Sequence, residues 1–124
     1  MTPSRSDLIS AAWSASSWQF PAGYTADDFT AAVENWEFWP VGGDGVLAGA
    51  IMATGPELHC CIKPEFFRRW VTPGMYRRVV RHKALYGRLV TRVNVDHDAG
   101  REFVERCGFT MTGNTGHVLH YEMR

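Results

Sequence analysis

The chain has 124 residues, 45% of them apolar, and it carries 13 basic and 13 acidic residues. This length and apolar content predict a single domain, residues 1–124, and exclude a fold that depends on disulfides for its core. The serine-interrupted segment 8–18 excludes an N-terminal signal peptide or a membrane span, so we expect a soluble cytoplasmic protein.

The charges are unevenly distributed. Residues 1–62 carry one basic and seven acidic residues, whereas residues 63–92 carry nine basic and one acidic residue. The basic segment predicts either contact with a polyanion, such as a nucleotide phosphate or nucleic acid, or a solvated face that pairs with the acidic N-terminal part. The sequence has no helix-turn-helix and no paired zinc ligands, so nucleic acid is the less favoured partner.

The three cysteines, Cys60, Cys61 and Cys107, are too few for a disulfide framework and have no CxxC spacing. We predict free, buried thiols. Neighbouring residues of a strand point to opposite faces, which argues against a zinc site formed by His59 with Cys60 and Cys61, and we expect no metal.

Two helices are predicted first. Asp7 is suited to cap a helix that ends near Trp18, and Thr25 with Asp28 has the spacing of a capping box for the second helix. Three short apolar and aromatic segments separated by glycine turns then predict an antiparallel meander. These segments are residues 36–41, 45–53 and 57–63.

Helices and strands alternate in the second half. Thr72 and Pro73 predict the start of a helix that reaches about Lys83. We predict that its buried face consists of Met75, Tyr76, Val79 and Val80. A strand, a helix ending at Gly108 and a hairpin follow, at residues 88–97, 99–107, 109–113 and 117–123. The whole order predicts an α+β fold, with a mixed, mainly antiparallel sheet flanked by helices.

This order and two segments resemble the GNAT family of acyl-CoA-dependent N-acyltransferases. The segment from His97 to Phe109 resembles the family pattern Asn-x-x-Ala-x-x-apolar-Tyr-x-x-x-Gly-Phe, with Gly100 at the alanine position and Phe103 at the apolar one. The segment 62–75 resembles the family's strand, proline and phosphate-binding turn. The resemblance implies a GNAT-like fold, acetyl-CoA as co-substrate and an amine as acceptor.

It also implies where acetyl-CoA binds: between the strands at 57–63 and 88–97, with its phosphates near Thr72. The cofactor-binding residues that we predict on this basis are Ile62, Phe67, Arg68, Arg69, Trp70, Val71, Thr72 and Asn94. The family's turn contains glycines, because backbone amides must approach the pyrophosphate closely. Residues 67–72 contain none, and Trp70 occupies a position where a bare backbone is expected.

The predicted catalytic residues are Glu57 and His59, which share one face of a strand, and either one is a candidate base for the incoming amine. A purely structural histidine is the alternative interpretation. Cys61 as an acyl-carrying nucleophile is less favoured, because no base accompanies it. Many family members protonate the departing thiolate with a tyrosine, but Val104 stands at that position and has no proton to donate.

Two functions follow from these observations. The first is an acetyl-CoA-dependent N-acetyltransferase with an altered phosphate turn. The second is a non-catalytic GNAT-like protein that acts through protein interaction and in which Trp70 fills the cofactor cleft. It is similar to the small, glycine-depleted GNAT-like proteins of tailed bacteriophages that assist morphogenesis or travel with the virion, which would place it in the host cytoplasm or the virion.

Overall fold

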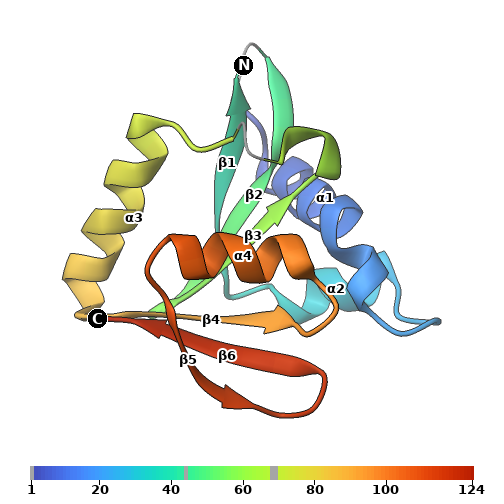
Figure 1. Cartoon of the computed structure of the whole chain (residues 1–124). Helices are drawn as coiled ribbons and strands as arrows, with labels where there is room; N and C mark the ends of the chain where they lie inside the picture. Colours follow the sequence, from blue (N-terminus) through green and yellow to red (C-terminus); the bar gives the residue numbers. More distant parts are fainter. Residues whose placement is uncertain (1, 44, 68–69) are drawn as a thin grey trace.

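The fold is described from a computed structural model, and the structure describes residues 2–43, 45–67 and 70–124 (Figure 1). The α-helices are α1 (Arg5–Ser16), α2 (Ala26–Ala32), α3 (Pro73–Tyr86) and α4 (Asp98–Arg106). The strands are β1 (Glu37–Gly43), β2 (Val46–Thr54), β3 (Glu57–Ile62), β4 (Leu89–Asn94), β5 (Thr110–Asn114) and β6 (Val118–Met123). Two short 3-10 helices are η1 (Ser17–Gln19) and η2 (Pro64–Phe66).

The six strands form one sheet in the order β1-β2-β3-β4-β6-β5. The first three strands are an antiparallel meander, as the sequence predicts, and β4, β6 and β5 are also joined by antiparallel pairing. Among the described strands, only the central neighbours β3 and β4 are parallel. The prediction of an α+β fold with a mixed, mainly antiparallel sheet is therefore confirmed.

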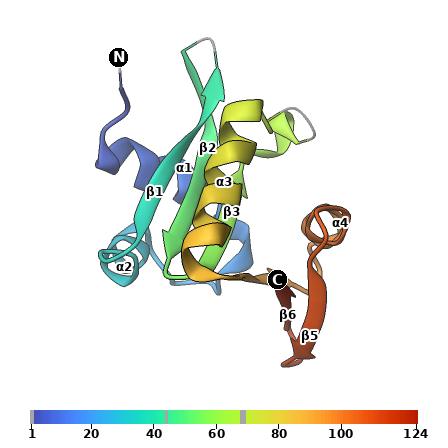
Figure 2. The same cartoon turned by 90° about the vertical axis from the view of Figure 1, so that its left-hand side faces the viewer.

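Helices cover both faces of the sheet. The helices α1 and α2 pack on one face through Leu8, Ala12 and Phe29, which contact Ala50 and Met52 of β2. The other face is covered by α3 and α4, and Figure 2 shows α3 over β1–β3 while α4 lies with β5 and β6. Strand β2 is buried on both sides, which explains its nearly continuous apolar sequence.

The helix starts show which residues cap each helix. Thr25 and Asp28 form the predicted capping box, and Thr72 caps α3 as expected. The prediction that Asp7 caps α1 is wrong, because the cap is Ser4, whose hydroxyl accepts a hydrogen bond from the Asp7 amide at 3.1 Å. Asp7 instead accepts one from the Ser4 amide, the reciprocal bond of a capping box.

The predicted buried face of α3 is partly wrong. Tyr76 and Val80 are 64% and 46% exposed, whereas Met75 and Val79 pack against the core. The helix meets the sheet along the stripe that continues to His82, whose ring lies 5.2 Å from the ring of Trp39. Tyr76 and Val80 each follow an inward residue and are turned toward solvent by the 100° step of the helix.

Two kinds of feature, a membrane-spanning helix and a metal-binding group, are not found in the described residues. Within the described residues, no helix is long and apolar enough to cross a membrane. In the same part of the chain, no three His, Cys, Asp or Glu side chains come together in a group that could hold a metal ion.

Candidate functional site

The site is organised by the way β3 and β4 meet. Their parallel register contains one residue pair in the described chain, Glu57 opposite Val90, and the Val90 amide donates to the Pro56 carbonyl at 2.9 Å. Beyond this pair β3 continues along β2 as far as Ile62, while β4 continues along β6 as far as Asn94. The two strands therefore part toward their carboxyl ends, and we call this feature the β3–β4 separation.

A glycine fixes β3 on the β2 side of the separation. Gly49 of β2 has a φ of +155° and lies against the β3 backbone, where an added Cβ atom would stand 2.1 Å from the carbonyl oxygen of Cys61. No side chain fits at that distance. The close approach holds β3 to β2 while β4 follows β6.

Solvent reaches β3 at the middle of the separation. Leu58 and Ile62 are buried on the face covered by α3, but Cys60 between them is exposed. The protein atoms around Cys60 nevertheless desolvate its thiolate and raise the pKa of the thiol to about 12. The prediction of buried thiols is thus wrong for Cys60, and also for Cys107, which is exposed as well.

Neither neighbouring cysteine is suited to carry an acyl group. Cys61 is half-buried and its Sγ lies 3.6 Å from the Sδ of Met52. Burial raises the pKa of the Cys61 thiol to about 12. Because the thiolate is the nucleophile, both Cys60 and Cys61 are unreactive near neutral pH.

Two aromatic contacts connect the segment after β3 with the segment after β4. The rings of Phe67 and His97 lie 6.1 Å apart, and those of Trp70 and Phe103 lie 5.1 Å apart. Trp70 is only 9% exposed and belongs to the core beneath α3. The Trp70 indole, at a position where the GNAT resemblance implies a bare backbone, is therefore packed between the start of α3 and α4.

The other predicted cofactor-binding residues are distributed as follows. Ile62 is buried in the core, whereas Val71 and Thr72 are exposed at the start of α3. The Thr72 hydroxyl accepts a hydrogen bond from the Met75 amide at 3.1 Å, so one amide of the helix end is already used. Asn94 ends β4, and its Oδ1 accepts a hydrogen bond from the Asp96 amide at 2.9 Å. The remaining two predictions, Arg68 and Arg69, lie outside the described residues.

The predicted catalytic residues are in direct contact at the closed end of the separation. His59 Nε2 lies 2.5 Å from Glu57 Oε2, and Arg92 of β4 donates to the same oxygen from Nε at 3.1 Å and from Nη2 at 2.9 Å. The hydrogen bond from His59 is the main cause that lowers the pKa of Glu57 to about 2; the charges of His59 and Arg92 add to it and outweigh desolvation. Glu57 is therefore an ionised carboxylate.

This pairing determines the roles of the two groups. An ionised carboxylate only accepts hydrogen bonds, so Nε2 of His59 carries the proton, and in neutral histidine Nδ1 is then left with its lone pair. A carboxylate with a pKa of about 2 is a weak base near neutral pH. Of the two residues, the Glu57 carboxylate is thus engaged by His59 and Arg92, whereas His59 in its neutral form has a free lone pair on Nδ1.

A hollow of about 250 Å³ adjoins Glu57 on the face of β4 and β6 that is turned away from α4. Its lining combines charges of both signs with hydroxyl groups and comes from Glu57, Arg88, Val90, Thr91, Arg92, Thr112, His120, Tyr121 and Glu122. Such a lining suits a polar, charged molecule.

Sequence reasoning missed Arg92, His97 and Phe103. Arg92 contacts Glu57 only because Val90 is opposite Glu57 in the parallel pair, and a sequence does not give that register. Val104, where the GNAT resemblance implies a tyrosine, packs against Leu119 and Tyr121 and has no proton to donate.

No protein-family model and no curated protein sequence matches the chain. Solved structures do match it. A protein from Desulfovibrio desulfuricans assigned to the GNAT family is 17% identical, with a TM-score of 0.67 over 99% of this chain and 95% of the other. The chain has the GNAT fold.

Two further GNAT-fold neighbours show the range of this similarity. The PaiA N-acetyltransferase of Thermoplasma acidophilum, solved in complex with coenzyme A, is 15% identical, with a TM-score of 0.65 over 94% of this chain and 90% of that one. The ribosomal-protein-S18-alanine N-acetyltransferase of Escherichia coli is 16% identical, with a TM-score of 0.63 over 99% and 90% of the two chains. The structural similarity establishes the GNAT fold of the chain, and at identities this low it establishes the fold alone.

Proposed function

We propose that the chain is an N-acyltransferase that moves an acyl group from acyl-CoA to an amine. The observation that carries the proposal is the β3–β4 separation, which begins at the residue pair Glu57–Val90 and has the His59–Glu57 pair at its closed end. The coenzyme A complex of a structural neighbour with the same fold supports this choice of co-substrate.

In the proposed reaction, the amine enters from the hollow beside Glu57 and attacks the carbonyl carbon of the thioester. A C–N bond forms, the C–S bond breaks, and Nδ1 of His59 takes the proton that the amine loses, directly or through one water. The Glu57 carboxylate keeps the imidazole in the required tautomer and stabilises its charged form. The thiolate takes its proton from solvent, because Val104 has none to give.

Acyl-CoA would lie along the edge of β3 between Glu57 and Ile62, with its phosphates at the start of α3. Thr72 and the basic residues Arg68 and Arg69 would bind there, since cations and helix amides are suited to phosphate. Trp70 and Phe103 would form the apolar wall of this path, and Asn94 would lie at the far end of β4.

A second candidate function is favoured by Trp70. Its indole is buried and contacts Phe103, so the same residues also fit a GNAT-fold scaffold in which the cofactor path is filled. Such a protein would act through protein contacts, for example in phage morphogenesis or as part of a virion, without catalysis.

Calorimetry with acetyl-CoA separates the two functions. The acyltransferase proposal predicts binding with a dissociation constant between about 1 μM and about 1 mM. If saturating acetyl-CoA gives neither heat nor a shift in melting temperature, the acyltransferase proposal is wrong and the scaffold stands.

Turnover tests the role of His59. With a panel of amines and acetyl-CoA, His59→Ala is expected to lose about 10²–10⁴-fold in kcat, the usual contribution of a general base. The matched control is His117→Ala, because His117 is exposed in the β5–β6 turn and lies away from the proposed chemistry. Equal activity of the two variants would rule out His59 as the base.

A further inference from the structure

Exposed apolar side chains are concentrated on and beside α3. Eight large hydrophobic residues are exposed in the described chain, and five of them fall between residues 71 and 86. These five are Val71, Tyr76, Val80, Leu85 and Tyr86, with exposed fractions of 45% to 74%. A cluster of this kind, as opposed to scattered single residues, marks an interaction surface.

The same helix is strongly basic. It carries Arg77, Arg78, Arg81 and Lys83, and no acidic residue occurs between residues 66 and 95. Arg78 lies over the ring of Trp39, with its Cζ 4.5 Å from the ring centroid. Arg77 and Arg81 are exposed and form no ion pair with any described residue. We call Tyr76, Arg77, Val80, Arg81 and Leu85 the α3 patch.

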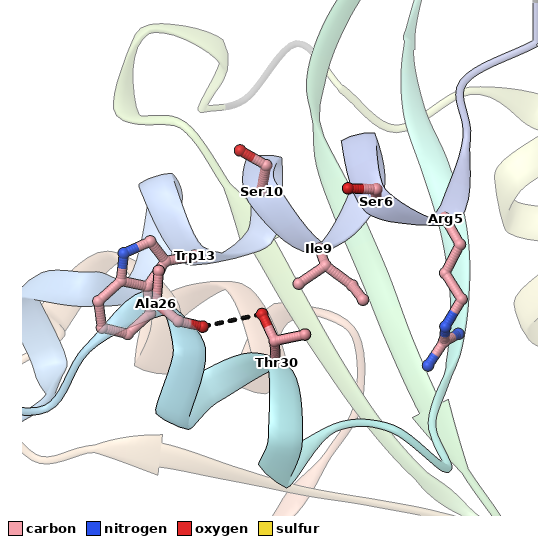
Figure 3. Close-up of a pocket in the computed structure, with 7 residues that line it drawn as sticks. All are labelled: Arg5, Ser6, Ile9, Ser10, Trp13, Ala26 and Thr30. Carbon is pink, nitrogen blue, oxygen red and sulfur yellow. Dashed lines mark hydrogen bonds between the residues drawn. The ribbon is translucent and has the colours of Figure 1, made fainter.

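A second surface, which is concave and belongs to an acidic part of the chain, lies on the other face of the sheet. A hollow of about 360 Å³ lies between α1 and α2, and Figure 3 shows the side chains that line it. It is lined mainly by Ile9, Trp13 and Ala26, with small hydroxyl side chains around them. We call it the α1–α2 hollow. Its apolar lining is open to an incoming apolar side chain.

The surroundings of the α1–α2 hollow are acidic. Asp7, Asp27, Asp28 and Glu34 are all exposed on α1, α2 and the residues just after α2. The one basic residue here is Arg5, and its guanidinium donates to the carbonyls of Val33, Glu34 and Trp36 at 2.7–3.0 Å. Arg5 itself lines the hollow and keeps its charge, so residues 2–36 carry one basic and four acidic residues and are net negative.

We propose that the α3 patch of one copy docks onto the α1–α2 hollow of a second copy. Leu85 or Tyr76 supplies the apolar side chain that enters the hollow, and Arg77 and Arg81 face the acidic residues around it. Docking of two α3 patches on each other is disfavoured, because it would oppose arginines to arginines. Nucleic acid would satisfy the arginines but would leave the apolar side chains of the patch uncovered.

The two surfaces lie on opposite faces of the sheet, since α3 covers one face and α1 and α2 the other (Figure 2). The contact is therefore head-to-tail, and each copy keeps one free surface of each kind, which produces a ring or an open chain of copies. A helix of 14 residues is about 21 Å long and about 10 Å wide. The area that one side of α3 can bury is therefore well below the roughly 800 Å² per partner of a stable interface. The association is accordingly weak and concentration-dependent.

Sedimentation equilibrium of the full chain tests this proposal. We expect association over about 10 μM to 1 mM protein, and at least tenfold weaker association when salt rises from about 0.01 M to about 1 M and the Debye length falls from about 30 Å to about 3 Å. Two charge reversals, Arg77→Glu with Arg81→Glu and Asp27→Lys with Glu34→Lys, should each abolish association. All these positions are exposed, so circular dichroism and melting are expected to show native folds.

A chain that carries both reversals gives the decisive outcome. Each reversal alone should leave the protein monomeric, but the chain with both should associate again, because its acidic α3 patch meets the basic α1–α2 hollow of the next copy. A merely structural effect of the substitutions would not be repaired by combining them. A native chain that stays monomeric throughout, a doubly reversed chain that stays monomeric, or binding of single-stranded DNA that depends on Arg77 and Arg81 without self-association would each overturn the proposal.

Discussion

Replacement of Trp70 by glycine tests whether the packing that joins the two sides of the β3–β4 separation stabilises the fold. A tryptophan side chain has roughly 200 Å² of surface, and Trp70 is 9% exposed, so about 180 Å² is buried. At about 25 cal/mol per Å² this burial contributes about 4.5 kcal/mol, within the range of about 3–5 kcal/mol found for large aromatic deletions. We therefore expect Trp70→Gly to lower the free energy of unfolding by about 4 kcal/mol.

Urea unfolding followed by circular dichroism measures this loss, and Trp18→Gly is the matched control. Trp18 is 53% exposed, so its deletion removes about half as much buried area and should cost about half as much. If Trp70→Gly proves too unstable to study, Trp70→Leu retains part of the apolar volume and should lose less than Trp70→Gly. A loss for Trp70→Gly no greater than that for Trp18→Gly would refute the packing argument.

The remaining predictions concern β3. Gly49→Ala should lower the free energy of unfolding by roughly 1–3 kcal/mol, because the added Cβ would clash with the Cys61 carbonyl. In the control Gly113→Ala the nearest neighbour of the added Cβ is 3.9 Å away, so stability should change little. Equal urea midpoints for the two variants would contradict this prediction. Glu57 has a pKa of about 2 in the fold against an ordinary value of 4.5, so its contribution is complete above pH 4.5 and is lost as the pH falls toward 2. After allowance for solvent screening, we expect the free energy of unfolding to fall by about 1–2 kcal/mol over this pH range. Urea titrations at several pH values measure this loss, which should be smaller in Glu57→Gln. An unchanged pH dependence in that variant would exclude the pairing of Glu57 with His59 and Arg92.

The order of helices and strands could be predicted from the sequence because each element carries its own local signal. Thr25 with Asp28 and Thr72 with Pro73 mark helix starts through bonds that span three residues. The alternation in β4, with Leu89, Thr91 and Val93 buried, follows from the two-residue period of a strand. These signals need no knowledge of distant parts of the chain.

The site could be predicted only as far as one strand reaches. Glu57 and His59 share a strand face, so their contact follows from their spacing. Arg92 is 35 residues from Glu57, and its two hydrogen bonds depend on the register of β4 against β3. Likewise, the exposure of Cys60 depends on where α3 and α4 leave β3 uncovered, which no local pattern encodes.

The single residue pair between β3 and β4 also has a mechanical consequence. Backbone hydrogen bonding joins β1–β3 to β4–β6 through the contact at Glu57 and Val90, and side chains such as Trp70 and Phe103 supply the rest of the attachment. The two halves of the sheet are thus held together by one backbone contact and by side-chain packing. When the molecule is pulled by its two termini, we expect β1–β3 to separate from β4–β6 first, while each half keeps its own strand pairing.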